Sequence, residues 1–234
     1  MILTGTIDNI FYVGYHLTEK SLCKGGNKCR NKPIERGGTV DLLQWMGGIC
    51  YFLNKVFLSF TERARYRGKA ESERRWRIAS WTVYLSGLPA WIIIFVSRRN
   101  WIAASVEASG APAMLLGLML ALRGIETKPP GWLDRTALVC MPLGFAYSLY
   151  DIGPMTTFTQ WLEVGLALGF LVGTYRLAKQ KTDGYRWFAL MNLSCGTLMG
   201  IQGYPWLALQ QALSLLFVAD AYRAGRRNKT LTYR

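Results

Sequence analysis

Residues 77–107 read RIASWTVYLSGLPAWIIIFVSRRNWIAASVE: one apolar run, a short basic turn and the start of a second apolar run. The first run, at 79–96, contains no charged residue. A helix needs about 20 residues to cross the hydrocarbon core of a bilayer, so this run is close to membrane-crossing length. The pattern predicts a membrane helix at 79–96 that is followed at once by another.

Hydropathy extends this pattern to seven predicted membrane helices along the 234 residues. They are expected at 39–60, 79–96, 101–122, 133–150, 158–177, 185–201 and 205–222. The chain is 51% hydrophobic and yet carries a formal net charge of +14, because Lys and Arg gather in the connections. We therefore expect an all-α membrane protein.

The basic connections also predict the orientation, because Lys and Arg in short loops stay on the cytoplasmic side. Nineteen of the 28 Lys and Arg lie at 61–78, 123–135, 176–186 and from Arg223 onward. This predicts seven spans in a bacterial-type inner membrane, with the N-terminus outside and the C-terminus in the cytoplasm. The basic segment KGGNKCRNKPIER would instead favour a cytoplasmic N-terminus. An interfacial helix at IDNIFYVGYHL would allow another arrangement of the N-terminus.

The same charge favours contact with anionic lipid headgroups of the bilayer. Nucleic-acid binding is not expected, because no helix-turn-helix, zinc-finger or RNP-like pattern accompanies the charge. We also expect no enzyme, cofactor or metal site, since His16 is the single histidine and no phosphate-binding or nucleophile motif occurs. Cys23 and Cys29 are close enough in sequence to form a disulfide or to bind a metal, but two cysteines alone are a weak ligand set.

An internal repeat relates 77–107 to 183–212, which reads DGYRWFALMNLSCGTLMGIQGYPWLALQQA. Each copy has two aromatic residues three positions apart, then a Trp that opens the next span, then a polar residue inside that span. The corresponding residues are Trp81 and Tyr84 with Tyr185 and Phe188, Trp101 with Trp206, and Glu107 with Gln211.

This repeat predicts two three-helix units joined by a linker helix, a 3+1+3 arrangement. The first unit is expected at 39–123, the linker region at 124–157 and the second unit at 158–222. The remaining parts are an N-terminal extramembrane segment at 1–38 and a basic cytoplasmic tail at 223–234. A repeat displaced by four spans crosses the membrane in the same direction, so the units are parallel, and a substrate is expected between them.

Residues 158–227 resemble the C-terminal half of PnuC-type nicotinamide riboside transporters, whose 3+1+3 architecture is similar to that of SWEET-type sugar transporters. The similarity runs from Glu163 through YRWFALMN and IQGYPW to LQQALSLLFVADAYRAGRR. The family signature here is W-x-x-W-x-x-x-N, and this chain has Tyr185, Phe188 and Asn192 in those places. The asparagine matches, whereas both tryptophans are replaced by other aromatic residues, which leaves the identity of the substrate open.

Tyr185, Phe188 and Asn192 share one helix face because they are separated by three and four residues. An unpaired Asn amide in hydrocarbon costs roughly 2–7 kcal/mol, so Asn192 must face protein, water or a ligand. A hydrogen bond to a neighbouring helix is one alternative. The resemblance implies the other: the rings stack on a flat aromatic head, and amides bind hydroxyl and carboxamide groups. Further candidates for substrate binding are Trp81, Tyr84, Glu107, Gln202 and Gln211; for Glu107, packing against a neighbouring helix is the alternative to attracting a cation.

Glu163 and Lys55 are further ionisable residues within the expected spans. Glu163 lies near the outer boundary, where water reaches it. Lys55, in FLNKVF, is expected to extend its side chain toward the inner surface of the membrane.

The expected function is transport of nicotinamide riboside or a related ring-bearing vitamin or nucleoside by alternating-access facilitated diffusion. The resemblance implies that a separate cytoplasmic kinase phosphorylates the substrate after entry. Two alternatives stay open: a PnuC-like carrier of thiamine or riboflavin, and a noncatalytic membrane scaffold or receptor whose N-terminal segment binds a partner. Assembly as a homo-oligomer also stays open.

Overall fold

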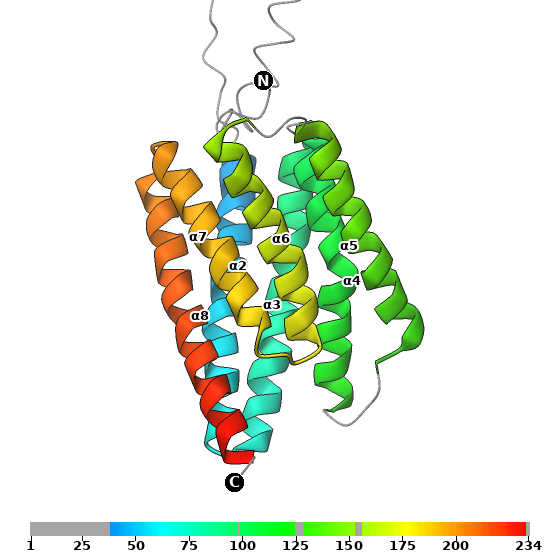
Figure 1. The fold of residues 1–234 in the computed structure, drawn as a ribbon, viewed down its shortest axis with the longest axis vertical. Coiled ribbons are helices and arrows are strands. Elements are labelled where there is room, and N and C mark those ends of the chain that lie inside the picture. Colours follow the sequence, from blue (N-terminus) through cyan, green and yellow to red (C-terminus); the bar gives the residue numbers. More distant parts are fainter. Residues whose placement is uncertain (1–37, 98, 125–128, 153–155, 233–234) are drawn as a thin grey trace, which may run out of the picture.

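The computed structural model describes residues 38–97, 99–124, 129–152 and 156–232, and this part of the chain is all-α with seven helices. The helices run side by side along the long axis of the bundle (Figure 1). Their bounds are α2 Gly38–Tyr66, α3 Ala70–Ser97, α4 Trp101–Arg123, α5 Gly131–Ile152, α6 Phe158–Ala178, α7 Gly184–Ile201 and α8 Pro205–Thr232. The expected all-α class is confirmed. Cys23 and Cys29 lie outside the described residues.

Six of the helices form a closed ring. Each helix packs on the next in the order α2, α3, α4, α6, α7 and α8. The ring is closed because α8 packs on α2. Helix α5 lies outside this ring and packs on α4 and α6, at one side of the bundle in Figure 1. In this order α2 lies opposite α6, α3 opposite α7, and α4 opposite α8.

Three of the described helices, α3, α4 and α6, are long and apolar enough to cross a membrane. The helices α2 and α7 carry buried polar residues, among them Asn54, Lys55, Asn192 and Ser194, which lower their hydropathy. The chain is thus a helical protein with three candidate membrane spans by length and composition, and the full set of seven spans stays a prediction.

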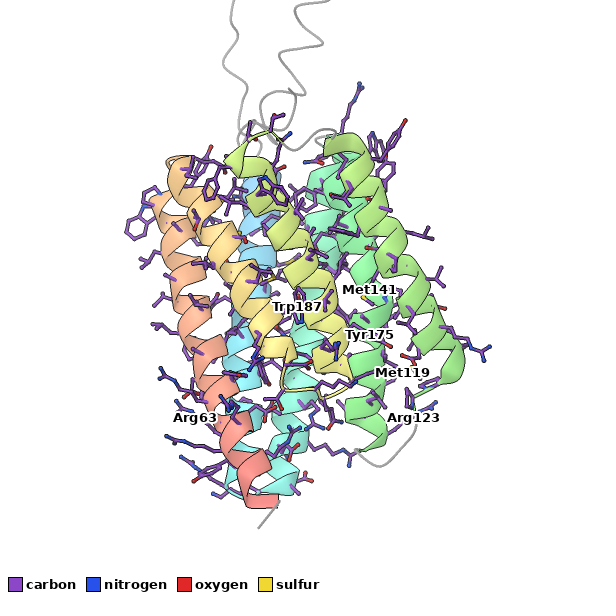
Figure 2. All side chains as sticks on the ribbon, in the orientation of Figure 1. Arg63, Met119, Arg123, Met141, Tyr175 and Trp187 are labelled. Carbon is purple, nitrogen blue, oxygen red and sulfur yellow. The ribbon has the colours of Figure 1, made fainter. Side chains whose placement is uncertain are left out.

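The helices extend further than the expected spans. Residues 61–78 were expected to connect two spans, but α2 continues to Tyr66 and α3 begins at Ala70, after a three-residue turn. Gly68 occupies this turn with φ +66°, a left-handed conformation that glycine adopts without a steric penalty. The basic tail is also helical, because α8 continues to Thr232. Arg63 and Arg123 lie toward the same end of the bundle, the end where α8 finishes (Figure 2).

Helices α6 and α7 approach closely at Gly169. A Cβ atom at this position would lie 2.6 Å from the backbone nitrogen of Met191 and 2.6 Å from the carbonyl oxygen of Trp187. Trp187 is labelled in Figure 2, on α7 beside α6. Backbone atoms cannot rotate away as side chains do, so the two helices would have to separate to accommodate any larger residue.

We therefore expect Gly169→Ala to lower the free energy of unfolding by about 1–3 kcal/mol, the usual cost of overpacking. Thermal unfolding of the detergent-purified protein measures the effect. Gly200→Ala is the matched control, because a Cβ at that exposed position of α7 would meet no described atom within 4 Å outside the adjacent turns of its own helix. Equal melting temperatures for the two variants would contradict the close approach of α6 and α7.

Candidate functional site

Aromatic residues from opposite sides of the ring meet at its axis. Tyr84 of α3 and Phe188 of α7 are both fully buried, and their ring centroids lie 6.2 Å apart at an interplanar angle of 83°. Tyr51 of α2 packs edge-on against Tyr84 at 4.8 Å, and Phe170 of α6 contacts Tyr84 at 6.3 Å. Edge-to-face pairs of this kind stabilise a core beyond the area that they bury.

Lys55 of α2 lies among these rings. Its Nζ is 4.6 Å from the ring centroid of Tyr84, 4.8 Å from that of Phe188 and 5.4 Å from that of Tyr51. The residue is 2% exposed, so the expectation that Lys55 extends its side chain to the membrane surface is wrong. The physical reason is that three ring faces offer the ammonium cation–π attraction inside the bundle.

A carboxylate binds the hydroxyl of Tyr51. The Tyr51 hydroxyl donates a hydrogen bond of 2.6 Å to Oε2 of Glu107, which α4 contributes. The ring of Tyr51 therefore contacts the Lys55 ammonium while its hydroxyl binds the Glu107 carboxylate. We call Tyr51, Lys55, Tyr84, Glu107 and Phe188 the axial site; they come from four helices of the ring.

Two buried amides of the bundle have an oxygen atom without a hydrogen-bond partner in the described part of the chain. Asn192 is 2% exposed; its Nδ2 donates to the carbonyl oxygen of Phe188 at 2.6 Å, and its Oδ1 is unpaired. Asn54, next to Lys55, donates to Oγ of Ser80 at 2.8 Å, and its Oδ1 is also unpaired. A buried acceptor without a partner costs roughly 1–3 kcal/mol, so each of these oxygens calls for an explanation.

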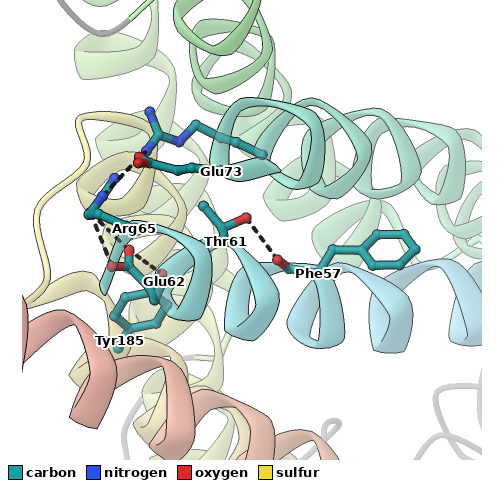
Figure 3. Close-up of polar contacts among 7 residues, drawn as sticks. Phe57, Thr61, Glu62, Arg65, Glu73 and Tyr185 are labelled. Carbon is teal, nitrogen blue, oxygen red and sulfur yellow. Dashed lines mark hydrogen bonds and ion pairs between the residues drawn. The ribbon is translucent and has the colours of Figure 1, made fainter. Parts of the chain in front are cut away.

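Tyr185 belongs to a different environment. Its hydroxyl donates to Oε1 of Glu62 at 3.0 Å, and Glu62 also pairs with Arg65 at 3.1 Å (Figure 3). Arg65 bonds Oε1 of Glu73 at 2.9 Å, and Arg77 pairs with the same carboxylate. We call Glu62, Arg65, Glu73, Arg77 and Tyr185 the polar cluster. It joins α2, α3 and α7 next to the turn between α2 and α3.

The polar cluster is largely shielded from solvent. Burial raises the pKa of Glu62 above its usual value, while Arg65 and the hydrogen bond from Tyr185 act in the opposite direction. A cavity of about 20 Å³ lies beside the cluster, bounded also by Trp81 and by Lys181. This volume accommodates about one water molecule. The side chains of the polar cluster therefore leave little free volume beside them.

The predicted site residues are thus divided between two places. Tyr84, Phe188 and Glu107 lie in the axial site, with Asn192 one helical turn from Phe188 on the same face. Tyr185 lies in the polar cluster, and the buried Trp81 lines the cavity beside it. Tyr185 was expected to stack on a substrate. Its hydrogen bond to Glu62 gives this residue a structural role that competes with that expectation.

The remaining candidates lie elsewhere. Gln211 is half-buried where α8 packs on Gly196 of α7, and Gln202 follows the last residue of α7. Glu163 is half-buried on α6, and its Oε1 has no hydrogen-bond partner among the described residues. The structure adds Tyr51, Lys55 and Asn54, which the sequence reasoning did not assign to a site.

Comparison with known proteins gave no match to a family model, to a curated protein or to a solved structure. The resemblance to PnuC-type transporters stays a prediction from the residues that carry it.

Proposed function

We propose that this chain is a seven-span membrane transporter that carries a small ring-bearing molecule along the axis of the six-helix ring by alternating access. The observation that carries the proposal is the axial site. Both three-helix units contribute to it, and it contains two ionisable residues, the buried Lys55 and the half-buried Glu107. A charge near the centre of a membrane costs about 2.5–3.5 kcal/mol on insertion scales, and such residues usually serve function.

The order of the ring supports this proposal. Helices α2–α4 form one unit, α6–α8 form the other, and α5 lies outside as a linker would. Transporters built from repeats have their substrate sites at the interface between the repeats, near the middle of the membrane. Tyr84 and Phe188, which correspond in the two repeats, contact one another at this interface.

The charge distribution supports a membrane orientation for the same bundle. The turn between α2 and α3 and the end of α8 lie at one end, and Arg63, Arg65, Arg67, Arg223, Arg226 and Arg227 are close to them in sequence. Basic residues at one end predict that this end faces the cytoplasm. The polar cluster then closes the axis from the cytoplasmic side.

For the substrate, we propose nicotinamide riboside or a related vitamin or nucleoside. A flat ring fits an aromatic site, and the unpaired oxygens of Asn192 and Asn54 would accept hydrogen bonds from hydroxyl groups. No catalytic role is assigned to the chain. Net uptake would depend on a cytoplasmic kinase that phosphorylates the substrate after entry, and thiamine and riboflavin are the competing cargoes.

The test is ligand-dependent thermal stabilisation of the detergent-purified protein. A ligand at 100 times its dissociation constant stabilises the folded state by about 2.7 kcal/mol. We expect a ring-bearing vitamin or nucleoside to raise the melting temperature of wild type, and Asn192→Ala to lose most of this shift. Among the described residues, the Asn192 side chain hydrogen-bonds only the carbonyl oxygen of Phe188 on its own helix, so the variant breaks no bond between helices and is expected to fold.

Leu193→Ala is the control, because Leu193 is the exposed neighbour of Asn192 on α7. It should retain the ligand-induced shift. If no nucleoside, thiamine or riboflavin stabilised wild type, the scaffold interpretation would replace transport.

A further inference from the structure

The axial site contains a cation of the protein itself. The Lys55 ammonium occupies the ring faces of Tyr51, Tyr84 and Phe188, which are the faces that a cationic aromatic ligand would use. On the basis of the transport function proposed above, we propose that the substrate is a zwitterion. Its carboxylate pairs with Lys55, and its cationic ring lies against the aromatic residues beside Glu107.

The first argument is the balance of charge. A purely cationic ligand in this site would bring a second positive charge close to Lys55, in a region where little water screens the repulsion. A ligand that also carries a carboxylate removes this conflict, because the carboxylate neutralises Lys55. Like charges in a site that excludes water are a common way in which proteins reject the wrong ligand.

The second argument is that the site contains two opposite charges. Tyr51 contacts both, since its ring contacts Nζ of Lys55 and its hydroxyl binds Glu107. Two opposite charges at one aromatic residue are complementary to a ligand that carries two opposite charges on one ring. The ligand would align its carboxylate toward Lys55 and its cation toward Glu107.

The third argument is the mobility of a lysine side chain. Lysine is a compact charge on a flexible four-carbon stem, so rotation of its side-chain torsions can move Nζ away from the three rings. The released ring faces then become available to the ligand. In this structure the Lys55 ammonium occupies the three ring faces.

The neutral polar groups complete the recognition. The unpaired Oδ1 atoms of Asn192 and Asn54 accept hydrogen bonds but cannot donate them. They suit hydroxyl groups of the ligand, whereas a carboxylate placed against them would be repelled. Lys55 is therefore the group in this region that distinguishes a carboxylate from a carboxamide.

The test compares two ligands that differ at one group. Nicotinic acid riboside is a zwitterion, and nicotinamide riboside has the same ring and ribose but a neutral carboxamide. Isothermal titration of the full chain in detergent should give at least tenfold tighter binding of the zwitterion by wild type. Lys55→Met should lose at least tenfold affinity for nicotinic acid riboside and should gain affinity for nicotinamide riboside, because the variant removes the positive charge close to the cationic ring.

Lys69→Met is the matched control, because Lys69 is exposed in the turn between α2 and α3. It should bind both ribosides as wild type does. Equal or tighter binding of nicotinamide riboside by wild type would overturn the zwitterion while leaving transport in place. Binding of another ring-bearing vitamin but of neither riboside would also overturn the zwitterion and leave transport in place. If no such ligand bound, the transport proposal would be overturned as well.

Discussion

Glu73→Ala is expected to lower the free energy of unfolding by about 3–5 kcal/mol, the usual cost of removing one partner from a buried ion pair. The side chain of Glu73 is 7% exposed, and its carboxylate binds both Arg65 and Arg77. Without it, the buried Arg77 loses its ion-pair partner. At roughly 2–4 °C per kcal/mol for a chain of this size, the melting temperature should fall by roughly 6–20 °C.

Glu71→Ala provides a control on the same helix. Glu71 also pairs with an arginine four residues later, Arg75 at 3.0 Å, but both side chains are more than two-thirds exposed. Exposed pairs of this kind contribute about 0.3–0.5 kcal/mol, so this variant should melt close to wild type. Similar melting temperatures for the two variants would show that the polar cluster does not stabilise the contact between α2, α3 and α7.

The positions of the helices were predictable because hydropathy reports burial or membrane contact directly. All seven expected apolar segments are helical in the described residues, and the ends of α4 and α6 lie within a residue of the predicted ends. The extension of α2 and α3 was not predicted. Their charged ends were interpreted as loop signals, whereas Glu62 with Arg65 and Glu73 with Arg77 have the spacing of helical ion pairs.

The axial site was only partly predictable. Helical spacing correctly placed Phe188 and Asn192 on one face of α7, and both are buried. Lys55 could not be located in this way, because hydropathy gives the depth of a residue in a span but not the direction in which its side chain points. The rings that bind Lys55 come from α3 and α7 as well as from α2, so only the tertiary packing reveals them.

Lys55→Met is expected to raise the free energy of unfolding, by about 1–4 kcal/mol, because replacing a buried charged group with an apolar residue of similar length is often stabilising. Methionine fills the same space with an unbranched chain and keeps favourable contacts between its sulfur and the surrounding rings. The lost cation–π attraction, about 0.5–2 kcal/mol, opposes this gain only in part. Thermal unfolding in detergent measures the net change.

The direction of this change separates a functional lysine from a structural one. If Lys55 binds the substrate, the protein retains a destabilising buried charge because activity requires it. The Lys55→Met variant is then more stable than wild type and has altered ligand selectivity. If the ammonium instead holds Tyr51, Tyr84 and Phe188 together, the variant should melt lower, as a core truncation does. Leu58→Ala, one turn along α2 at a buried position, is the reference for a core truncation. It should lower the free energy of unfolding by about 2–5 kcal/mol. A melting temperature for Lys55→Met near that of Leu58→Ala would assign Lys55 to the structure of the core.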